Sequence, residues 1–454
     1  MEREKLGSRL GFILLSAGCA IGIGNVWKFP YITGQCGGGA FVLLYLFFLV
    51  IMGIPAMTME FSLGRASQKS PVRLYQALKP NPGAWAIHGY AAMAGNYLLM
   101  MFYTTVAGWM LRYFVSTAAG SFSGMTPEQV SAQFGSICAD PVSMVVFMGI
   151  VVIVGFFICS FSLQNGLERV TKYMMIALLA VMLILAVNSV TMAGAKEGLS
   201  FYLKPDLEKM REIGVGTVIV GAMNQAFFTL SLGIGSMAIF GSYIGKERAL
   251  MGESINVVVL DTFVAIVSGL IIFPACFTHG VEVNSGPDLI FITLPNIFNH
   301  MPLGRVWGSL FFVFMTFAAM STVLAVFENI LSCCMDLTGW SRKKACLING
   351  CAMLILSLPC ALGFNLLSGV HPLGAGTNFM DLEDFIVSNM LLPLGAVVYI
   401  LFCTRKAGWG WDNFIAEANT GKGIKVPNWI RGYATYVLPV VMVIVFLIGI
   451  ISYF

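Results

Sequence analysis

The stretch that decides the fold occupies residues 18–30 and reads GCAIGIGNVWKFP. It lies in an apolar segment that begins near Leu10, and it has glycines at positions 18, 22 and 24, followed by Asn25. Each glycine costs roughly 1 kcal/mol of helix propensity, and unpaired backbone groups in hydrocarbon are costly unless they line a site. The pattern therefore indicates either a membrane helix that breaks at mid-span and turns its backbone toward a ligand, or a small-residue face for helix packing.

Composition places the chain in a membrane. It has 454 residues, of which 58% are hydrophobic and 11% charged, whereas about 25% of the residues of a soluble domain are charged. These values predict an all-α polytopic membrane protein with one large domain over residues 1–454. The net charge of +4 comes from basic residues in short loops and does not indicate a nucleic-acid partner. The 11 cysteines are scattered and lack the spacing of metal ligands.

Eleven segments are long and apolar enough to be transmembrane helices. We place them at residues 10–36, 40–64, 86–117, 142–161, 167–193, 215–243, 252–278, 304–336, 345–366, 380–403 and 433–453. The apolar run that ends at Phe298 is too short to cross the bilayer, so we expect a re-entrant or capping helix between the seventh and eighth spans.

The basic residues predict the orientation of the spans. With the amino terminus inside, the cytoplasmic segments contain 19 of the 26 Lys and Arg residues, while the loops 118–141, 279–303 and 367–379 contain none. Because cytoplasmic loops are enriched in Lys and Arg, we expect a cytoplasmic amino terminus and an external carboxyl terminus.

The sixth span contains a second interruption. Residues 224–236 read NQAFFTLSLGIGS and again combine polar residues with glycines at mid-span. Two broken helices five spans apart are typical of an inverted five-helix repeat with a binding site at its interface. We therefore assign helices 1–5 (10–193) to the first repeat, helices 6–10 (215–403) to the inverted second repeat, and 433–453 to helix 11. The two breaks together favour a binding site over a packing face.

Several motifs resemble those of the neurotransmitter:sodium symporter family, and in particular its bacterial amino-acid transporters with eleven helices. They are RLG at 9–11, residues 18–30, GGGAF at 37–41, GIP at 53–55 with Glu60, and residues 225–235. The resemblance covers nearly the whole chain. It implies sodium-coupled symport of a neutral, hydrophobic α-amino acid by alternating access, in the inner membrane of a bacterium, with no enzymatic activity. It leaves open whether the protein forms a homodimer.

The resemblance implies two sites for Na⁺, a cation that prefers oxygen ligands. The first would use the carbonyl groups of Ala20 and Thr229 and the side chains of Asn25 and Thr229, together with the substrate carboxylate. The seventh span supplies the last ligand. Asp261 aligns where the family usually has Asn, and Asn256 is the alternative if the helix carries an insertion.

Asp261 also predicts independence from chloride. A carboxylate inside a span is costly unless it is paired, so the alternative is a structural, protonated or hydrogen-bonded acid. Chloride-dependent relatives have a Ser one turn later, where this chain has Ala265. We expect Asp261 to supply the negative charge that chloride supplies elsewhere.

The second implied Na⁺ site lies between the first and eighth spans. Its ligands would be the carbonyl groups of Gly18, Ile21 and Ala318 and the hydroxyl groups of Ser321 and Thr322. Such hydroxyls on a helix usually bond back to a carbonyl one turn earlier, but here two adjacent hydroxyls lie opposite the first break.

The implied substrate site adjoins the first Na⁺ site. The α-carboxylate would bind the amides of Ile23 and Gly24, at a half-helix amino terminus that favours anions, with the hydroxyl of Tyr103 as a further donor. The ammonium would meet the carbonyls of Ala20, Phe228 and Ser231, beside Thr229. The substrate side chain would contact Leu99, Phe228, Ile234, Val323 and Val326, a set that suits aliphatic or aromatic amino acids alike.

Two charged pairs are implied as gates. Lys28 would face Asp384 at the outer mouth, and Arg3 would pair with Asp336 at the inner mouth, near Tyr243; the alternative is that these charges only extend toward the interface. Glu60 is expected to tie the second span to the broken sixth one.

Other functions fit the sequence less well. A membrane sensor would need a signalling domain, and the longest cytoplasmic segment, about 404–432, is too short for one. An intramembrane enzyme would need paired carboxylates or a metal cluster within the spans. A proton-coupled carrier of the related amino-acid/polyamine superfold would place a cationic residue near Ser321 and Thr322.

Overall fold

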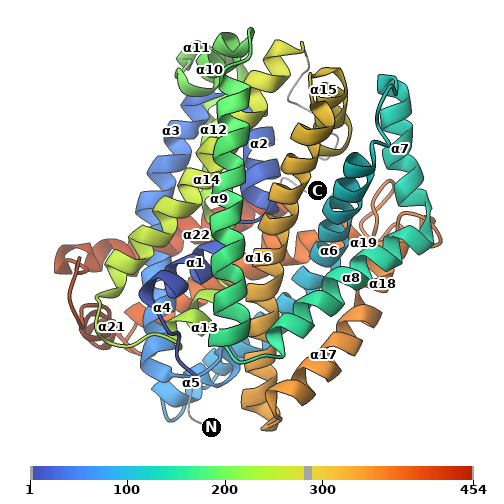
Figure 1. The fold of residues 1–454 in the computed structure, drawn as a ribbon. Helices are drawn as coiled ribbons and strands as arrows, with labels where there is room; N and C mark the ends of the chain where they lie inside the picture. Colours follow the sequence, from blue (N-terminus) through green and yellow to red (C-terminus); the bar gives the residue numbers. More distant parts are fainter. Residues whose placement is uncertain (1–3, 281–288, 452–454) are drawn as a thin grey trace.

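The computed structural model describes residues 4–280 and 289–451, and within these ranges its named elements are all helices. Helices α9 (Arg169–Val190) and α16 (Gly304–Thr338) pack side by side and run most of the height of the molecule (Figure 1). The fold is therefore the all-helical membrane architecture that the sequence predicts.

The first five predicted spans correspond to five helical segments. Two of them are single helices, α6 (Trp85–Ala119) and α8 (Pro141–Cys159). The others include turns of other helix types: α1 (Arg9–Ala20) with η1 (Gly24–Lys28) and α2 (Phe29–Gln35); α3 (Gly39–Phe48) with η2 (Leu49–Gly53) and α4 (Ile54–Ser67); and η3 (Gln164–Glu168) with α9.

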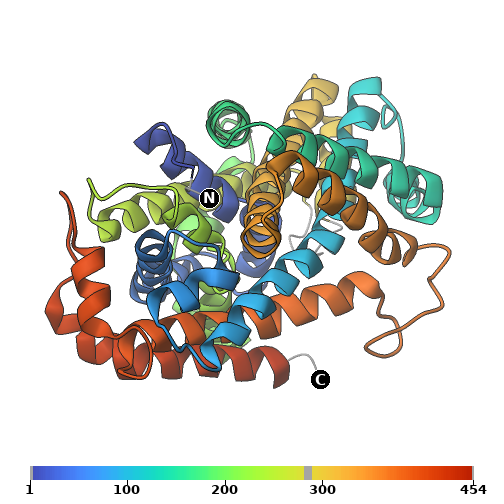
Figure 2. The ribbon, with the colours of Figure 1, turned by 90° about the horizontal axis from the view of Figure 1, so that it is seen from below.

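The remaining six spans follow the same plan. They are α12 (Val215–Phe228) with α13 (Ser236–Gly241); α14 (Leu250–Thr278); α16; α17 (Arg342–Leu356) with α18 (Leu358–Leu362); α19 (Phe379–Asp384) with η5 (Phe385–Leu391) and α20 (Leu392–Thr404); and η6 (Asn428–Ile430) with η7 (Tyr433–Val437) and α22 (Leu438–Ile451). Helix α22 packs along α20 at the edge of the molecule (Figure 2).

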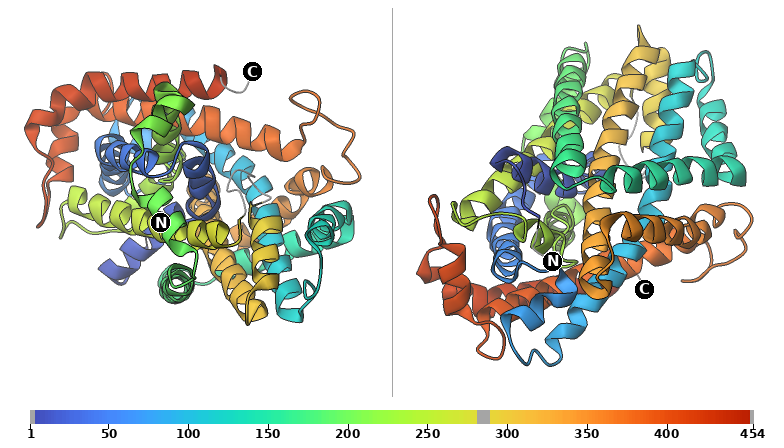
Figure 3. Two further views of the ribbon diagram at one scale, coloured as in Figure 1. Left: turned by 90° about the horizontal axis from the view of Figure 1, so that it is seen from above. Right: turned by 60° about the horizontal axis from the view of Figure 1, so that its bottom comes forward.

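Short helices cover both ends of the bundle. Helices α10 (Ala195–Leu203) and α11 (Leu207–Ile213) lie across one end, as the view from above shows (Figure 3). Helix α7 (Pro127–Ala139) and the turn η4 (Leu289–Thr293) with α15 (Leu294–His300) belong to the same end, and the latter pair forms the capping helix predicted near Phe298. Helices α5 (Pro71–Leu78) and α21 (Trp411–Ala418) lie toward the other end (Figure 1).

Length and apolar character alone reveal most of the spans. In the described residues, nine helices are long and apolar enough to cross a membrane, and the pair Arg9–Ala20 and Gly24–Gln35, bent by 57°, makes a tenth. The predicted span 215–243 does not pass this test as one helix, because it is divided into α12, with 14 residues, and α13, with 6.

Both breaks lie where the sequence predicts them. Helix α1 ends at Ala20, and Ile21 has an extended backbone. In the sixth span the chain leaves α12 at Phe228, and Ser231, Gly233 and Gly235 then have positive φ values. Gly233 has two reasons to be glycine, since its φ is +101° and a Cβ there would lie 2.1 Å from the carbonyl oxygen of Leu392.

Candidate functional site

A cavity of about 370 Å³ lies between the two broken helices and α6. Most of its wall is apolar, and its polar groups lie at the two breaks and at the mouth. Its lining residues are Cys19, Ala20, Gly22, Ile23, Gly24, Trp27, Lys28, Tyr31, Leu99, Phe102, Tyr103, Val106, Phe228, Thr229, Ser231, Ile234, Thr322, Met380, Asp381, Asp384 and Leu392. Concave, largely apolar sites with a few convergent polar groups are typical of small-molecule binding.

One cluster of polar side chains joins the two breaks to α14. Asp261 is fully buried, and its Oδ1 accepts a hydrogen bond of 2.8 Å from Asn25 Nδ2. The hydroxyl of Thr229 donates to Asp261 Oδ2 at 3.1 Å. The residue of α14 that contacts both Asn25 and Thr229 is therefore Asp261, and not Asn256.

A second oxygen cluster lies between α16 and the break of α1. The hydroxyl of Thr322 is 3.3 Å from the carbonyl oxygens of Gly18 and Ile21. Ser321 Oγ is 3.3 Å from the carbonyl oxygen of Ile21 and 2.9 Å from that of Ala318. All four distances exceed the 2.7–2.8 Å or so that is usual for an O–H···O bond. The five oxygen atoms predicted as ligands of the second Na⁺ site therefore lie around one small space.

The Thr322 hydroxyl resolves an ambiguity of the sequence. A threonine on a helix usually bonds back to its own helix, as Thr316 does with the carbonyl of Phe312 at 2.7 Å. The contacts of Thr322 instead cross to residues 18, 19 and 21 on the first span. This hydroxyl is thus directed at the broken backbone, not at its own helix.

The amide side of the first break faces Tyr103. The backbone N–H of Ile23 donates to the Tyr103 hydroxyl at 3.0 Å. A Cβ on Gly22 would lie 2.5 Å from that hydroxyl, and a Cβ on Gly24 would lie 3.1 Å from the ring of Phe228. The glycines therefore let backbone and aromatic side chains approach closely at the cavity.

Buried polar side chains support the break in the sixth span from outside the cavity. Glu60 on α4 accepts hydrogen bonds from the amides of Gly233 and Met237, at 3.1 and 3.2 Å. The carbonyl of Ile234 accepts from the amide groups of Asn96 and Asn329, at 2.9 and 3.1 Å. Glu60 thus joins the second span to the sixth as the sequence predicts, whereas the two asparagines were not anticipated.

The predicted outer gate residues share the cavity without touching. Lys28 and Asp384 both line it, but no ion pair links these two described residues. Lys28 Nζ lies 3.7 Å from the centre of the Phe228 ring, and Asp384 accepts a hydrogen bond of 2.6 Å from the Ser388 hydroxyl. The outer pair is therefore parted in this structure.

The opposite end has a polar network around the predicted inner gate. Arg3 lies outside the described residues, and Asp336 accepts a hydrogen bond from the amide of Ser70 at 2.8 Å. Tyr243 donates to Glu328 at 2.6 Å. Arg342 binds the same Glu328 carboxylate through both terminal nitrogens, at 2.7 and 2.9 Å.

Comparison with known proteins agrees with this arrangement. The sequence pattern that defines the sodium:neurotransmitter symporter family matches residues 3–129 and 136–454. The chain belongs to this family.

Relatives of this symporter-family chain match it from end to end. The uncharacterized sodium-dependent transporter YhdH of Bacillus subtilis (strain 168) is 35% identical over 454 residues, 98% of each protein. The sodium-dependent serotonin transporter of Drosophila melanogaster is 25% identical and matches 99% of this chain and 77% of its own length. The solved structure of MhsT in complex with L-phenylalanine shares 36% identity and a TM-score of 0.87, covering 98% of this chain and all of the other.

Two residues predicted for the pocket of this symporter-family member do not line its cavity. Val323 and Val326 are fully buried but absent from the wall. Successive helical residues point about 100° apart, so Val323 turns away from the face that Thr322 presents. Its Cγ1 lies 3.4 Å from the Cβ position of Gly155 on α8. Val326 lies one turn further along α16, beyond the cavity.

The cavity wall also contains residues that were not predicted from the sequence. The additional residues include Trp27 and Tyr31 on the first span, Phe102 and Val106 on α6, and Met380 on α19. Helical spacing could have found most of them, because Phe102 and Val106 lie three and seven positions after Leu99, on one face. Likewise, Trp27 and Tyr31 lie three and seven positions after Gly24.

Proposed function

We propose that the protein is a sodium-coupled symporter of neutral, hydrophobic α-amino acids. The observation that carries this proposal is the Thr322 hydroxyl, which crosses to the carbonyl oxygens of Gly18 and Ile21 and does not bond to its own helix. With the Ser321 hydroxyl and the Ala318 carbonyl, these groups form a set of oxygen ligands that suits a hard cation. Among the described residues no group of three or more His, Cys, Asp or Glu side chains could hold a metal ion, so hydroxyls and carbonyls dominate the candidate cation sites.

The cluster of Asn25, Thr229 and Asp261 is the proposed first Na⁺ site. Asn25 and Thr229 lie on the two breaks, and Asp261 supplies a negative charge between them. The carbonyl of Ala20 and the carboxylate of the substrate would complete the set. Binding of ion and solute would then be coupled, because each adds a ligand or a charge that the other uses.

The cavity suits an amino acid with an apolar side chain. Ile23 and Tyr103 would bind the carboxylate, while the carbonyls near Ala20, Phe228 and Ser231 would meet the ammonium. Leu99, Phe102, Val106, Phe228 and Ile234 surround the remaining space, whose volume of about 370 Å³ lies in the usual range for small-molecule sites. The MhsT structure contains L-phenylalanine, and we propose that phenylalanine is among the substrates here.

Transport would proceed by alternating access across the inner membrane of a bacterium. Residues 10–193 and 215–403 would be the inverted repeats and 433–453 the additional helix. The amino terminus would be cytoplasmic and the carboxyl terminus external. Lys28 and Asp384 would close the outer side, and Arg3 and Asp336 would close the inner side near Tyr243. Assembly as a homodimer is part of this proposal.

Uptake into proteoliposomes tests the proposal. We expect accumulation of labelled phenylalanine or leucine when Na⁺ is outside, and little when choline replaces Na⁺. Thr322→Val should reduce Na⁺-driven uptake about tenfold or more, because it removes a buried oxygen ligand worth at least about 1.4 kcal/mol. Thr316→Val, on the same helix, is the matched control and should transport normally. Equal uptake in Na⁺ and choline would refute sodium coupling.

A further inference from the structure

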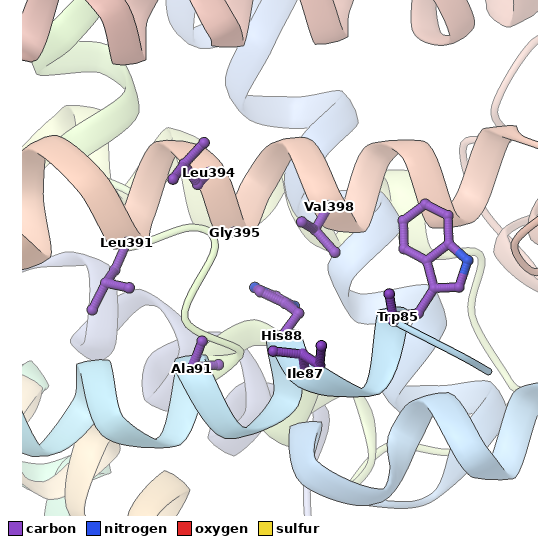
Figure 4. Close-up of a pocket in the computed structure, with 10 residues that line it drawn as sticks. Trp85, Ile87, His88, Ala91, Leu391, Leu394, Gly395 and Val398 are labelled. Atoms are coloured by element: carbon purple, nitrogen blue, oxygen red, sulfur yellow. The ribbon is translucent and has the colours of Figure 1, made fainter.

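A second cavity lies outside the transport site, between the first turns of α6 and the helix α20. Its volume is about 460 Å³, and its lining residues are Ala84, Trp85, Ile87, His88, Ala91, Ala92, Leu391, Leu394, Gly395 and Val398. Figure 4 shows the two rows of side chains facing each other across the space, with His88 between them. Apart from His88 and the indole nitrogen of Trp85, the lining side chains are hydrocarbon.

The exposed apolar rim of this cleft suits it to contact with lipid. Both of its walls belong to membrane-spanning helices, and at its rim Ile87 is 68% exposed and Leu394 38% exposed. Its length along α20, from Leu391 to Val398, is about 10 Å at 1.5 Å per residue. One leaflet contributes about 15 Å of the hydrocarbon core, so the cleft is shorter than one leaflet is thick.

Basic residues lie near Trp85, at one end of the cleft. The carbonyl of Ala407 accepts hydrogen bonds from Lys79 Nζ and, at 3.2 Å, from Trp85 Nε1. Exposed Arg405 and Lys406 immediately precede Ala407, and the Arg405 guanidinium lies 5.2 Å from the centre of the Tyr436 ring. In the described part of the chain, none of these three basic side chains forms an ion pair with a carboxylate. A tryptophan beside basic residues is typical of a membrane–water interface.

We propose that this cleft binds an acyl chain of an anionic glycerophospholipid, with the lipid phosphate at Lys79, Arg405 and Lys406. The apolar walls match the chain, and the positive charges near Trp85, which form no ion pair with a carboxylate of the described residues, match the headgroup. A zwitterionic lipid would fit the walls equally well but would gain less at the mouth.

The bound chain would contact the support of the broken sixth helix. His88 Nε2 lies 3.1 Å from the carbonyl oxygen of Gly233, within that break. Gly395 packs so closely there that a Cβ would lie 2.1 Å from the same oxygen. An acyl chain in the cleft would therefore press on His88 and Gly395 from the lipid side and stabilise this conformation of the break.

Fluorescence quenching by brominated lipids tests the proposal on the purified full-length chain in uncharged detergent. Phosphatidylglycerol brominated on its acyl chains should quench tryptophan fluorescence saturably and bind about tenfold more tightly than phosphatidylcholine brominated at the same carbons. Trp85→Phe should remove most of the saturable quenching. The double variant R405Q/K406Q should bind the two lipids with similar affinity, whereas the control K343Q/K425Q, with the same change in charge, should keep the preference.

Filling the cleft gives an independent measurement. Ala91→Phe should abolish the saturable quenching of tryptophan fluorescence. If the Ala91→Phe protein does not fold, the R405Q/K406Q variant still tests the proposal. Equal binding of both lipids by the unmodified protein would overturn the proposal, as would quenching that is indifferent to Trp85→Phe. Intermolecular disulfides through Ile87→Cys would also overturn it, because they would show that a second copy covers the cleft. None of these measurements depends on transport, so the proposed function can fail without affecting them.

Discussion

At the scale of single residues, Asp261 is the most informative. It is fully buried on a membrane-spanning helix, where an isolated carboxylate is costly. Donors from both broken helices converge on it, Asn25 at 2.8 Å and Thr229 at 3.1 Å. Through these two hydrogen bonds, Asp261 joins both broken helices to α14.

The charge of Asp261 predicts how chloride should act. Asp261→Asn keeps the size of the side chain but removes the negative charge, so we expect uptake to fall about tenfold to a hundredfold, as for loss of a charged hydrogen-bonding group.

Ala265 is buried one helical turn later, on the same face. Adding Ala265→Ser to Asp261→Asn should restore uptake only when chloride is present. Uptake assays with chloride or gluconate measure this, and Ala265→Ser alone is the control. Absence of chloride dependence in every variant would contradict the interpretation of Asp261.

The residue scale also shows what the sequence can predict. Polar residues inside spans, such as Ser321 and Thr322, stand out because burial without a partner is costly, and the structure gathers them with the predicted carbonyls. Apolar residues carry no such signal. Val323 was assigned to the pocket, yet it packs against α8 near Gly155, because leucine and valine fit a helix interface as well as a substrate wall. The direction in which they point depends on packing between helices that are distant in sequence.

At the scale of elements, buried polar side chains of neighbouring helices hydrogen-bond to the break in the sixth span. The positions of both breaks could be predicted, because glycines and polar residues interrupt otherwise apolar runs. The network that stabilises them was only partly predictable. Glu60 was expected to reach the sixth span, but the contacts of Asn96 and Asn329 with the Ile234 carbonyl require three helices to meet, which no local pattern encodes.

Removing the Glu60 carboxylate should destabilise the broken conformation. Glu60→Leu would leave the buried amides of Gly233 and Met237 without their acceptor, at about 1–3 kcal/mol for each group. Glu60→Gln keeps one acceptor oxygen and should have a smaller effect. We expect the melting temperature of the purified protein to fall in the order native, Gln, Leu, and substrate affinity to fall with it. Glu212→Leu, on the exposed end of α11, is the control. A Leu variant as stable as the native protein would show that Glu60 is not needed to hold the break.

At the scale of the whole molecule, the two ends of the transport path differ in how they are held. At the cavity mouth, Lys28 and Asp384 form no ion pair with each other within the described residues. At the opposite end, Arg342 binds buried Glu328, lies 3.7 Å from Glu4, and donates to the carbonyl of Cys159 at 3.1 Å. The amino-terminal segment is also tied to the sixth span by the hydrogen bond from the Leu6 amide to the carbonyl of Tyr243, two residues after the end of α13. One arginine thus connects the amino-terminal segment with α16 and α8.

This asymmetry predicts that Arg342 keeps the amino-terminal end closed. Arg342→Gln would remove the guanidinium that neutralises the buried Glu328 carboxylate, and breaking a buried ion pair in this way costs about 3–5 kcal/mol. Opening of that end relieves the cost, because water then reaches Glu328. Hydrogen exchange measured by mass spectrometry should therefore become faster in residues 4–20 and in α13. Lys343→Gln changes the charge equally at the next, exposed position and should leave exchange unchanged. If Arg342→Gln exchanges like the native protein in both segments, the closed end is held by other contacts, and the Arg342–Glu328 pair contributes only to packing.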